Sequence, residues 1–321
     1  MTKAQIHEAS RTLRLAAAVT ALAVPAAAGV QAQEIEPPAE GYELVWNDEF
    51  DGDELNRANW CTRLVHGGGS PLQIDDPECT GPGGQYGTGD FLKDERQKYR
   101  DVNRLDEPLH VVEDGALTLR ATKTRTDDEW HMFESALIRS KFEFKPVGDE
   151  TYYIVSRLRL PTQLGSFAAQ WLSAGFGDNG EYSWPPEIDT LEAALNGQED
   201  NERMVRVGAY VAETQTESGS EEFTQVGENF DTTWNNLHYP TTLRGVWVDV
   251  EAVWTANDVC TYINGELAQC ENYFWVDNDA EPANPAHIIF NLAVGGEWAG
   301  RHGIDDGPMT YDIDYVRIFK K

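Results

Sequence analysis

Three carboxylates lie close together in one short stretch of the sequence, "EIDTLE", which runs from Glu187 to Glu192. Glu187 and Asp189 are two residues apart, so in a β-strand their side chains point to the same face. Glu192 would point away in a regular strand, but one extra residue in a β-bulge after Asp189 would return it to that face. A helix would spread the three acids around its surface. We therefore predict a bulged strand with the acids on one face and with Ile188 and Leu191 on the other.

Carboxylates held this close suit acid–base chemistry, because like charges in contact raise one pKa and keep another group ionised. Hydrolysis of a glycosidic bond with retention uses such a pair about 5–5.5 Å apart: one carboxylate attacks the anomeric carbon, and the other donates a proton and then accepts one from water. An acid between them can hydrogen-bond the nucleophile. Two other interpretations stay open, a solvated strand face and a set of calcium ligands.

The rest of the chain predicts the β-structure that would hold such a strand. Short runs rich in β-branched and aromatic residues alternate with turn signals, such as Asp114-Gly115 within "LHVVEDGALTLRAT". Amphipathic helices of useful length are absent, apart from a possible helical turn at 53–60. Long loops are expected at 66–90 and 213–235. The pattern favours an all-β protein whose antiparallel strands pack as two sheets.

The chain has four cysteines, which fit an oxidising compartment: Cys61, Cys79, Cys260 and Cys270. Four cysteines allow three pairings. Asn264-Gly265 signals a two-residue hairpin turn, and a bulge or a three-residue loop would bring Cys260 opposite Cys270. We predict a Cys260–Cys270 disulfide and, by default, Cys61–Cys79.

The N-terminal residues have the composition of a secretory signal peptide: a basic start, an apolar run and small residues that end at Ala32. A membrane anchor is less well supported, because the run is short and broken by Pro25. We predict a signal peptide at 1–32, a short linker at 33–40 and a single catalytic domain at 41–321. The mature protein would be secreted or periplasmic, with no membrane attachment.

The charge balance limits the partners. The formal net charge is −30, from 25 basic and 55 acidic residues. Phosphate binding needs clustered Lys and Arg, so nucleic acid is not an expected partner. A polyanionic ligand would also be repelled at long range. We expect a monomer that acts on a polysaccharide, since the ten tryptophans and twelve tyrosines include rings enough for sugar stacking as well as for a core.

The stretch "WPPEIDTLE" resembles the signature of glycoside hydrolase family 16, which reads Glu-x-Asp-x-x-Glu in its bulged form. Further stretches resemble other segments of that family in the same order, and together they cover nearly all of 41–321: 43–60, 115–123, 291–300 and 312–320. The resemblance implies a β-jelly-roll with a concave substrate cleft and retaining endo-hydrolysis of β-linked polysaccharides, without a cofactor for catalysis.

By motif position, the resemblance implies that Glu187 is the nucleophile, Asp189 the assisting acid and Glu192 the general acid/base. It also implies substrate contacts from residues that match the family's cleft positions: Trp171, Trp184, Asn291 and Trp298. A structural calcium ion, remote from the cleft, would involve Glu49 and Asp314. The chain departs from the family's common pattern on the strand after the signature, where we expect Tyr210 to take the space of a frequent histidine.

These observations predict a secreted, endo-acting, retaining glycosidase that cleaves β-1,3 or mixed β-1,3/1,4 glucan. A hydrolase of marine galactans (agar, porphyran or carrageenan type) is the alternative within the same class. Sulfated substrates would call for cationic side chains such as Arg139, Arg157 and Arg159. A non-catalytic carbohydrate-binding protein on the same fold and a calcium-stabilised structural protein are the alternatives from other classes.

Overall fold

The computed structural model describes the following residues: 35–64, 79, 94–124, 131–175, 184–212, 224–225, 230–277, 279 and 281–321. Backbone contacts divide the chain into Met1–Glu36 and Pro37–Lys321, and every strand discussed below lies in the second unit. The predicted signal peptide at 1–32 lies outside the described residues, as does the expected loop at 66–90 apart from Cys79. Within the described part of the chain, we find no helix with the length and apolar character of a membrane span.

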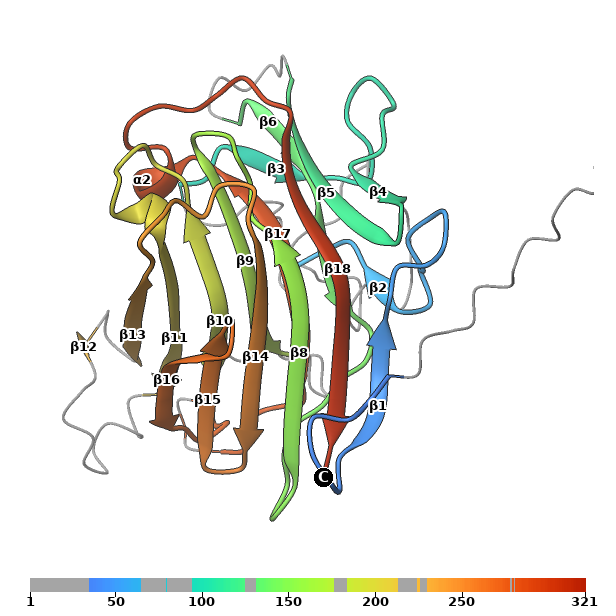
Figure 1. Cartoon of the computed structure of the whole chain (residues 1–321), viewed down its shortest axis with the longest axis vertical. Helices are drawn as coiled ribbons and strands as arrows, with labels where there is room; N and C mark the ends of the chain where they lie inside the picture. The colour runs from blue at the N-terminus through green and yellow to red at the C-terminus, as the bar shows by residue number, and fades with distance from the viewer. Residues whose placement is uncertain are drawn as a thin grey trace, which may run out of the picture. The chain divides into compact units, whose positions relative to one another are not determined.

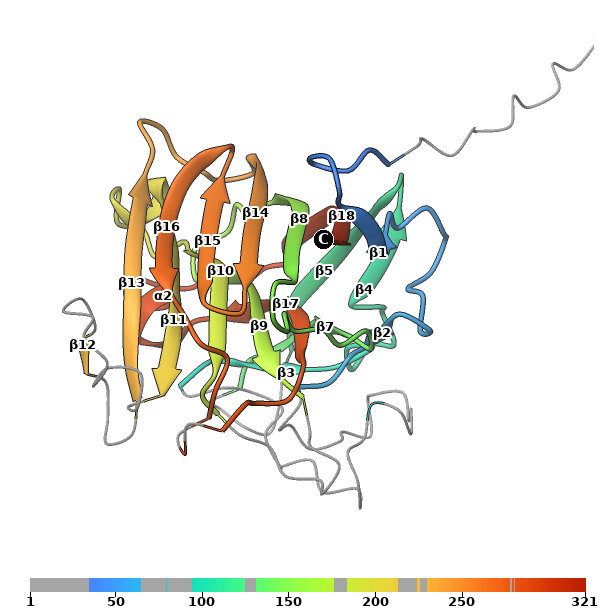
Figure 2. The ribbon, with the colours of Figure 1, turned by 90° about the horizontal axis from the view of Figure 1, so that it is seen from below.

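The strands form two sheets that lie over one another, as Figure 2 shows. One sheet contains β1 (Glu43–Asp48), β3 (Gln97–Tyr99), β4 (His110–Glu113), β5 (Ala116–Lys123), β6 (Phe133–Ser135), β8 (Thr151–Arg159), β14 (Trp247–Thr255), β15 (Asp258–Ile263), β16 (Glu266–Asn272) and β18 (Met309–Lys320). The other contains β2 (Trp60–Cys61), β7 (Leu137–Ser140), β9 (Ser166–Ala174), β10 (Glu187–Ala194), β11 (Met204–Ala212), β12 (Thr224–Gln225), β13 (Phe230–His238) and β17 (Ala286–Val294). Two short helical turns accompany them, η3 (Asn201–Arg203) and α2 (Gly296–Ala299).

The pairing within both sheets is antiparallel except between β3 and β6. In the eight-stranded sheet the order is β12-β13-β11-β10-β9-β17-β7-β2, so the carboxylate strand β10 is central, between β9 and β11 (Figure 1). A central strand has both edges hydrogen-bonded, which holds its backbone rigidly. The predicted all-β architecture of two antiparallel sheets is confirmed.

The main hydrophobic core fills the space between the two sheets. Strand β14 shows its origin in the sequence, because buried and half-buried side chains alternate along all nine residues. Ile188 and Leu191 contribute to this core from β10, as predicted, and Trp60 and Trp254 are fully buried in it. Burying one large apolar side chain stabilises a fold by about 1.5–3 kcal/mol. The core therefore fixes which face of β10 is left for the acids.

The predicted hairpin turns and both predicted disulfides are present. Asp114 and Gly115 have φ values of 54° and 76°, the left-handed conformation that a two-residue hairpin turn of this type requires. Asn264 and Gly265 do the same between β15 and β16. A bulge after Thr261 places Cys260 opposite Cys270, and these two form one disulfide. Cys61 and Cys79 form the other.

One expectation about local structure is wrong. The loop expected at 213–235 contains the start of β13, which pairs with β11 over nine residues. Its sequence, "FDTTWNNLH", has weak strand propensity, so the hydrogen-bonding edge of β11 decides its conformation. The helical turn expected at 53–60 is a single turn, in which the Trp60 amide donates a hydrogen bond to the Asn56 carbonyl at 3.1 Å. The carboxylate of Asp48 anchors this segment, because it accepts hydrogen bonds from the Phe50 amide and from the Trp60 indole.

Candidate active site

The extra residue that the spacing of the acids requires is Thr190. Asp189 pairs with Trp171 and Leu191 with Gln170, which leaves Thr190 between them with no partner on β9. The Thr190 hydroxyl donates a hydrogen bond to the Gln170 carbonyl at 3.0 Å. The threonine is fully buried, so this bond satisfies its polar side chain in the bulge. The predicted β-bulge between Asp189 and Glu192 is confirmed.

The bulge brings the three carboxylates to one face of β10. Glu187 pairs with Tyr210 on β11, Asp189 with Gly208 and Glu192 with Arg206. These three partners follow one another at intervals of two residues along β11. Directly paired residues of antiparallel strands point to the same side, and residues two apart along a strand share that side. We call this side, the outer face of the eight-stranded sheet, the catalytic face. Asp189 is buried there, whereas Glu187 and Glu192 are half-buried.

Glu187 is held from its side chain and from its backbone. The Trp184 indole Nε1 donates a hydrogen bond to Glu187 Oε2 at 2.7 Å, as expected for a tryptophan placed beside the signature. The hydroxyl of the buried Tyr273 lies 3.0 Å from the carbonyl oxygens of both Glu187 and Tyr210. A charge-assisted hydrogen bond and a locked backbone both reduce the positions that this carboxylate can adopt.

Tyr210 is the aromatic residue that responds to all three acids. Burial raises the pKa of its hydroxyl first, and the charges of Asp189, Glu187 and Glu192 raise it further. The phenol therefore stays protonated at neutral pH. Its ring lies 5.0 Å from the Trp184 ring between centroids, so Tyr210 and Trp184 lie together beside Glu187.

Gly208 allows an aromatic ring to approach the acids closely. Gly208 stands opposite Asp189, and a Cβ atom there would come within 1.9 Å of the Thr233 carbonyl oxygen and 2.5 Å of the Trp234 ring. The Trp234 ring packs edge-to-face on Tyr210, with 5.4 Å between centroids. Only glycine leaves room for this arrangement, so the residue type at 208 is set by packing beside the acids.

Trp171 and Asn291, predicted to contact substrate, are part of a packed layer on the catalytic face. The Trp171 indole donates to Asn291 Oδ1 at 2.8 Å, and the Asn291 amide donates to the Tyr99 hydroxyl at 2.9 Å. Trp171 is only 5% exposed and Asn291 only 4%. Leu64, Tyr99 and Leu137 are among the residues that cover them. Their geometry suits positioning of the neighbouring acids better than an open stacking platform.

Trp298 lies on α2 at the other end of the row of acids. Its ring meets Phe167 edge-to-face, with 5.1 Å between centroids. The guanidinium carbon of Arg206 lies 4.1 Å from the centroid of the Trp298 ring. Trp298 is half-buried, so part of its surface stays accessible beside Glu192, which pairs with Arg206.

The three arginines considered for sulfate recognition are not available at the acids. Arg139 points to the catalytic face but is 3% exposed, and its Nη1 lies 2.8 Å from Nε2 of the buried His287. Arg157 and Arg159 extend from β8 in the other sheet, where both lie over the Trp247 ring. The suggestion that these three arginines recognise a sulfated substrate beside the acids is therefore wrong, because one side chain is buried and the other two lie on the other sheet.

The side chains suggested for a structural calcium ion are already engaged with cations. Glu49 accepts two hydrogen bonds from the Arg317 guanidinium, at 2.9 and 2.6 Å. Asp314 lies 3.7 Å from Nε of Arg157. Among the described residues, no group of three or more His, Cys, Asp and Glu side chains is arranged to hold a metal ion. The side chains present here do not fit calcium, and no chemical step is assigned to it.

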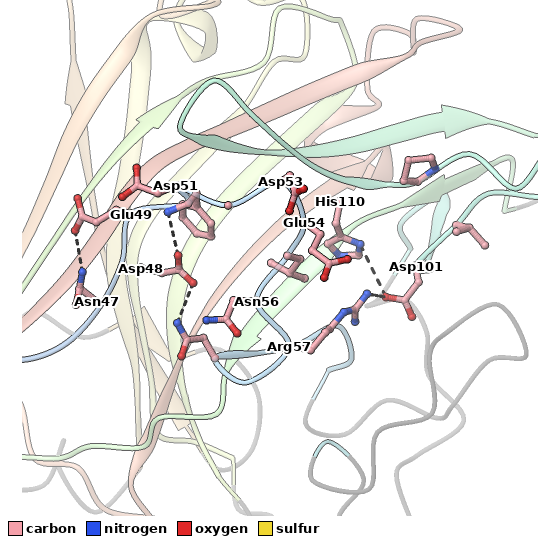
Figure 3. A pocket seen from close by; sticks show the side chains of 16 residues that line it. Asn47, Asp48, Glu49, Asp51, Asp53, Glu54, Asn56, Arg57, Asp101 and His110 are labelled. Carbon is pink, nitrogen blue, oxygen red and sulfur yellow. Dashed lines mark hydrogen bonds and ion pairs between the residues drawn. The ribbon is translucent and has the colours of Figure 1, made fainter. Parts of the chain in front are cut away.

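A separate pocket of about 840 Å³ is lined by the loop after β1 and by residues next to β4 (Figure 3). Its lining includes Arg57, which forms an ion pair with Asp101 at 2.7 Å, and the buried His110. None of the three acids of β10 lines it. The pocket is therefore distinct from the catalytic face.

Sequence reasoning missed several residues that surround the acids: Arg206, Trp234, Tyr273 and His287. They come from β11, β13, the segment after β16, and β17, so no local motif links them to "EIDTLE". The only available signal was the number of aromatic residues, which does not say which of them converge.

The chain is similar to known proteins in sequence and in structure. No family model matches the chain. The chain is 25% identical over 301 residues to glucan endo-1,3-beta-glucosidase A1 of Niallia circulans, a match that covers 89% of this chain and 39% of that protein. The chain thus spans well under half the length of this curated relative.

Solved structures agree with the sequence match. The laminarinase catalytic domain from Thermotoga maritima MSB8 superimposes with a TM-score of 0.59 and 25% identity, over 88% of this chain and 99% of that domain. SCLam, a non-specific endo-beta-1,3(4)-glucanase from family GH16, has a TM-score of 0.60 and 20% identity, over 88% of this chain and 94% of SCLam. These likenesses confirm the β-jelly-roll fold and the resemblance to glycoside hydrolase family 16.

Proposed function

We propose that this chain is an endo-acting, retaining glycoside hydrolase that cleaves β-1,3 or mixed β-1,3/1,4 glucan. The observation that carries the proposal is the bulge at Thr190, because it brings Glu187, Asp189 and Glu192 to one face at the centre of a rigid sheet. A strand that only needed solvated acids would have no use for this irregularity, nor for the tryptophan that hydrogen-bonds Glu187.

The residues divide the reaction between them. The Glu187 carboxylate attacks the anomeric carbon while Glu192 gives its proton to the glycosidic oxygen, so the C–O bond breaks and a glycosyl-enzyme ester forms. Glu192 then takes a proton from water, and the resulting hydroxide displaces Glu187 with net retention. Asp189, buried between them, limits how charge and protons are shared within the group. The Trp184 N–H holds Glu187 in place for attack.

The named relatives support the choice of substrate class. The curated relative from Niallia circulans is named a glucan endo-1,3-beta-glucosidase, and the solved neighbours are named a laminarinase and an endo-beta-1,3(4)-glucanase. These three names favour β-glucan over galactan. The two disulfides and the signal-peptide composition of 1–32 support a protein exported from the cytoplasm. A polysaccharide is too large to enter a cell, so export agrees with this substrate.

A product profile tests the function directly. Wild type and Glu187→Gln would be incubated in parallel with laminarin, mixed-linkage β-glucan, agarose and carrageenan, and the products would be measured by mass spectrometry. We expect oligosaccharides of several lengths from the glucans with wild type only, and NMR of the first products would show the β-anomer. Products from agarose or carrageenan alone would mean that the substrate is a galactan rather than a β-glucan. Retention of a polymer without any products would instead indicate a carbohydrate-binding protein.

A further inference from the structure

Arg206 is a charged residue of the catalytic face that the reaction does not use. It stands opposite Glu192 in the register of β10 and β11. Its guanidinium carbon lies 4.1 Å from the centroid of the Trp298 ring and 5.5 Å from that of Trp234. Contacts of this kind with aromatic faces hold a planar guanidinium in place without consuming its N–H donors.

The hydrogen-bonding capacity of Arg206 is largely unused. Its Nε donates to Asn236 Oδ1 at 3.3 Å, and within the described part of the chain its guanidinium forms no ion pair. By contrast, Arg159 and Arg317 each form an ion pair with a carboxylate. The chain has 55 acidic and 25 basic residues, so an acidic partner would be easy to supply. The guanidinium of Arg206 instead lies over two tryptophan rings, and its four Nη N–H groups donate no hydrogen bond to a described residue.

We propose that Arg206 binds a negatively charged substituent, a carboxylate or a sulfate ester, on the sugar unit that lies next to Glu192. This inference rests on the proposed function and adds to it a preference for β-glucans that carry acidic groups. The planar fork of a guanidinium matches the paired oxygens of either anion, and the tryptophans fix the fork before the ligand arrives.

The strongly negative net charge does not oppose this pairing. Exposed charges more than about 8 Å apart are largely screened at physiological ionic strength. The overall charge therefore slows the approach of a highly charged polymer, whereas contact with a single substituent is decided by its immediate neighbours. A glucan with one anionic group per several sugars would approach the protein without strong repulsion and could still place an anion against Arg206. A uniformly sulfated galactan, which is charged throughout, would be repelled as it approaches.

Matched substrates test the inference. Mixed-linkage β-glucan would be compared with the same polymer lightly carboxymethylated and with the same polymer lightly sulfated. The chains tested would be wild type, Arg206→Gln, Arg206→Lys and the control Arg157→Gln, which removes an arginine that also lies over a tryptophan but in the other sheet. The measured quantity would be kcat/KM, with kcat and KM separated, at low and at high NaCl.

We expect Arg206→Gln to lower kcat/KM on one charged polymer about tenfold more than on the neutral parent, mainly through KM, as loss of a charge-assisted bidentate contact predicts. Arg206→Lys should recover part of the difference, because it keeps the charge but not the fork. High salt should shrink the difference, and Arg157→Gln should not produce it. The polymer that responds would identify carboxylate or sulfate as the ligand.

An equal loss on neutral and charged polymers would overturn the inference, because Arg206 would then serve sugar hydroxyls or packing alone. The proposed function would survive that result, since wild type would still cleave the neutral glucan. Failure of wild type to cleave these polymers and laminarin would overturn the proposed function instead. Circular dichroism of each variant would exclude unfolding as the cause of a uniform loss.

Discussion

The Trp184 indole donates a 2.7 Å hydrogen bond to Oε2 of Glu187, three residues further along the chain. Trp184 lies just before β10, and Glu187 is the first residue of β10. The hydrogen bond therefore links the segment that leads into the strand to the Glu187 carboxylate. The Tyr273 hydroxyl adds a 3.0 Å contact with the backbone carbonyl oxygen of Glu187.

Removing the donor should slow the reaction without abolishing it. Trp184→Phe keeps an aromatic ring beside Tyr210 but loses the N–H, and a hydrogen bond to a charged group contributes about 1.5–3 kcal/mol. We expect kcat/KM on the cleaved glucan to fall about tenfold or more. Steady-state kinetics would measure this, and an unchanged rate would mean that Glu187 is positioned by its backbone alone.

Replacing the nucleophile should remove turnover and leave the fold intact. Glu187→Gln preserves size and the ability to accept the Trp184 hydrogen bond, but an amide cannot form the glycosyl ester. We expect turnover to fall to background while the melting temperature stays close to that of wild type. Asp189→Asn should be milder, since Asp189 does not form the covalent bond. Equal and total loss in both variants would contradict these roles.

Gly208 should not tolerate even one methyl group. Gly208→Ala would place Cβ 1.9 Å from the Thr233 carbonyl, so β11 and β13 would have to separate beside Asp189. Overpacking of this kind costs about 1–3 kcal/mol. Thermal unfolding would show a lowered melting temperature together with reduced activity. Gly52→Ala is the control, because its nearest contact would be an ordinary 3.5 Å.

Stability should fall on mild acidification because of two buried histidines. Burial is the main cause that lowers the pKa of both His110 and His287, although the nearby carboxylates Asp101 and Glu143 oppose it. The unfolded chain therefore binds more protons than the folded one as the pH drops below about 6.5, the ordinary value for histidine. The stabilising effect of keeping both rings neutral is complete above that pH and is lost below it.

Melting temperatures measured at several pH values between about 8 and about 5 would test this linkage, because histidine titrates over this window. His110→Gln can still donate to the Leu137 carbonyl but cannot take up a proton. The variant should show a shallower decline toward acid than wild type. A parallel decline in both chains would assign the effect to other groups.

Calcium removal should leave the protein as stable as before. The Arg317 guanidinium already neutralises Glu49, with N–O distances of 2.9 and 2.6 Å. We expect EDTA and added Ca²⁺ to give the same melting temperature. Arg317→Gln should lower the free energy of unfolding by up to about 1 kcal/mol, since the pair is partly buried. A clear loss of stability in EDTA alone would restore calcium to this region.

The sequence was sufficient where local chemistry dictates geometry. The spacing of the acids predicted the bulge, because a period of two admits no other way to align Glu187 with Glu192. Asn264-Gly265 predicted a turn that sets the position of a disulfide. Both inferences depend on residues within about ten positions of one another, and tertiary context had little freedom to change them.

The sequence was insufficient where distant segments meet. Strand β13 forms because β11 offers it a partner, not because its own residues favour a strand. Trp171 looked like a sugar platform but is covered by Leu64 and Tyr99, which come from segments at least 70 residues earlier. Arg206 reaches Trp298 from nearly a hundred residues away. Such contacts follow from sheet order, which no short pattern specifies.

The bulge at Thr190 makes β10 a strand with two phases. Before it, odd-numbered residues such as Asp189 face the catalytic side, and after it, even-numbered residues such as Glu192 do. Because Thr190 is the extra residue, a strand without it would alternate regularly and would keep Asp189 and Glu192 on the catalytic face and Leu191 in the core. A regular strand that kept Thr190 would instead exchange Leu191 and Glu192 between the catalytic face and the core, and the chain would lose its reaction and its interior packing in one event.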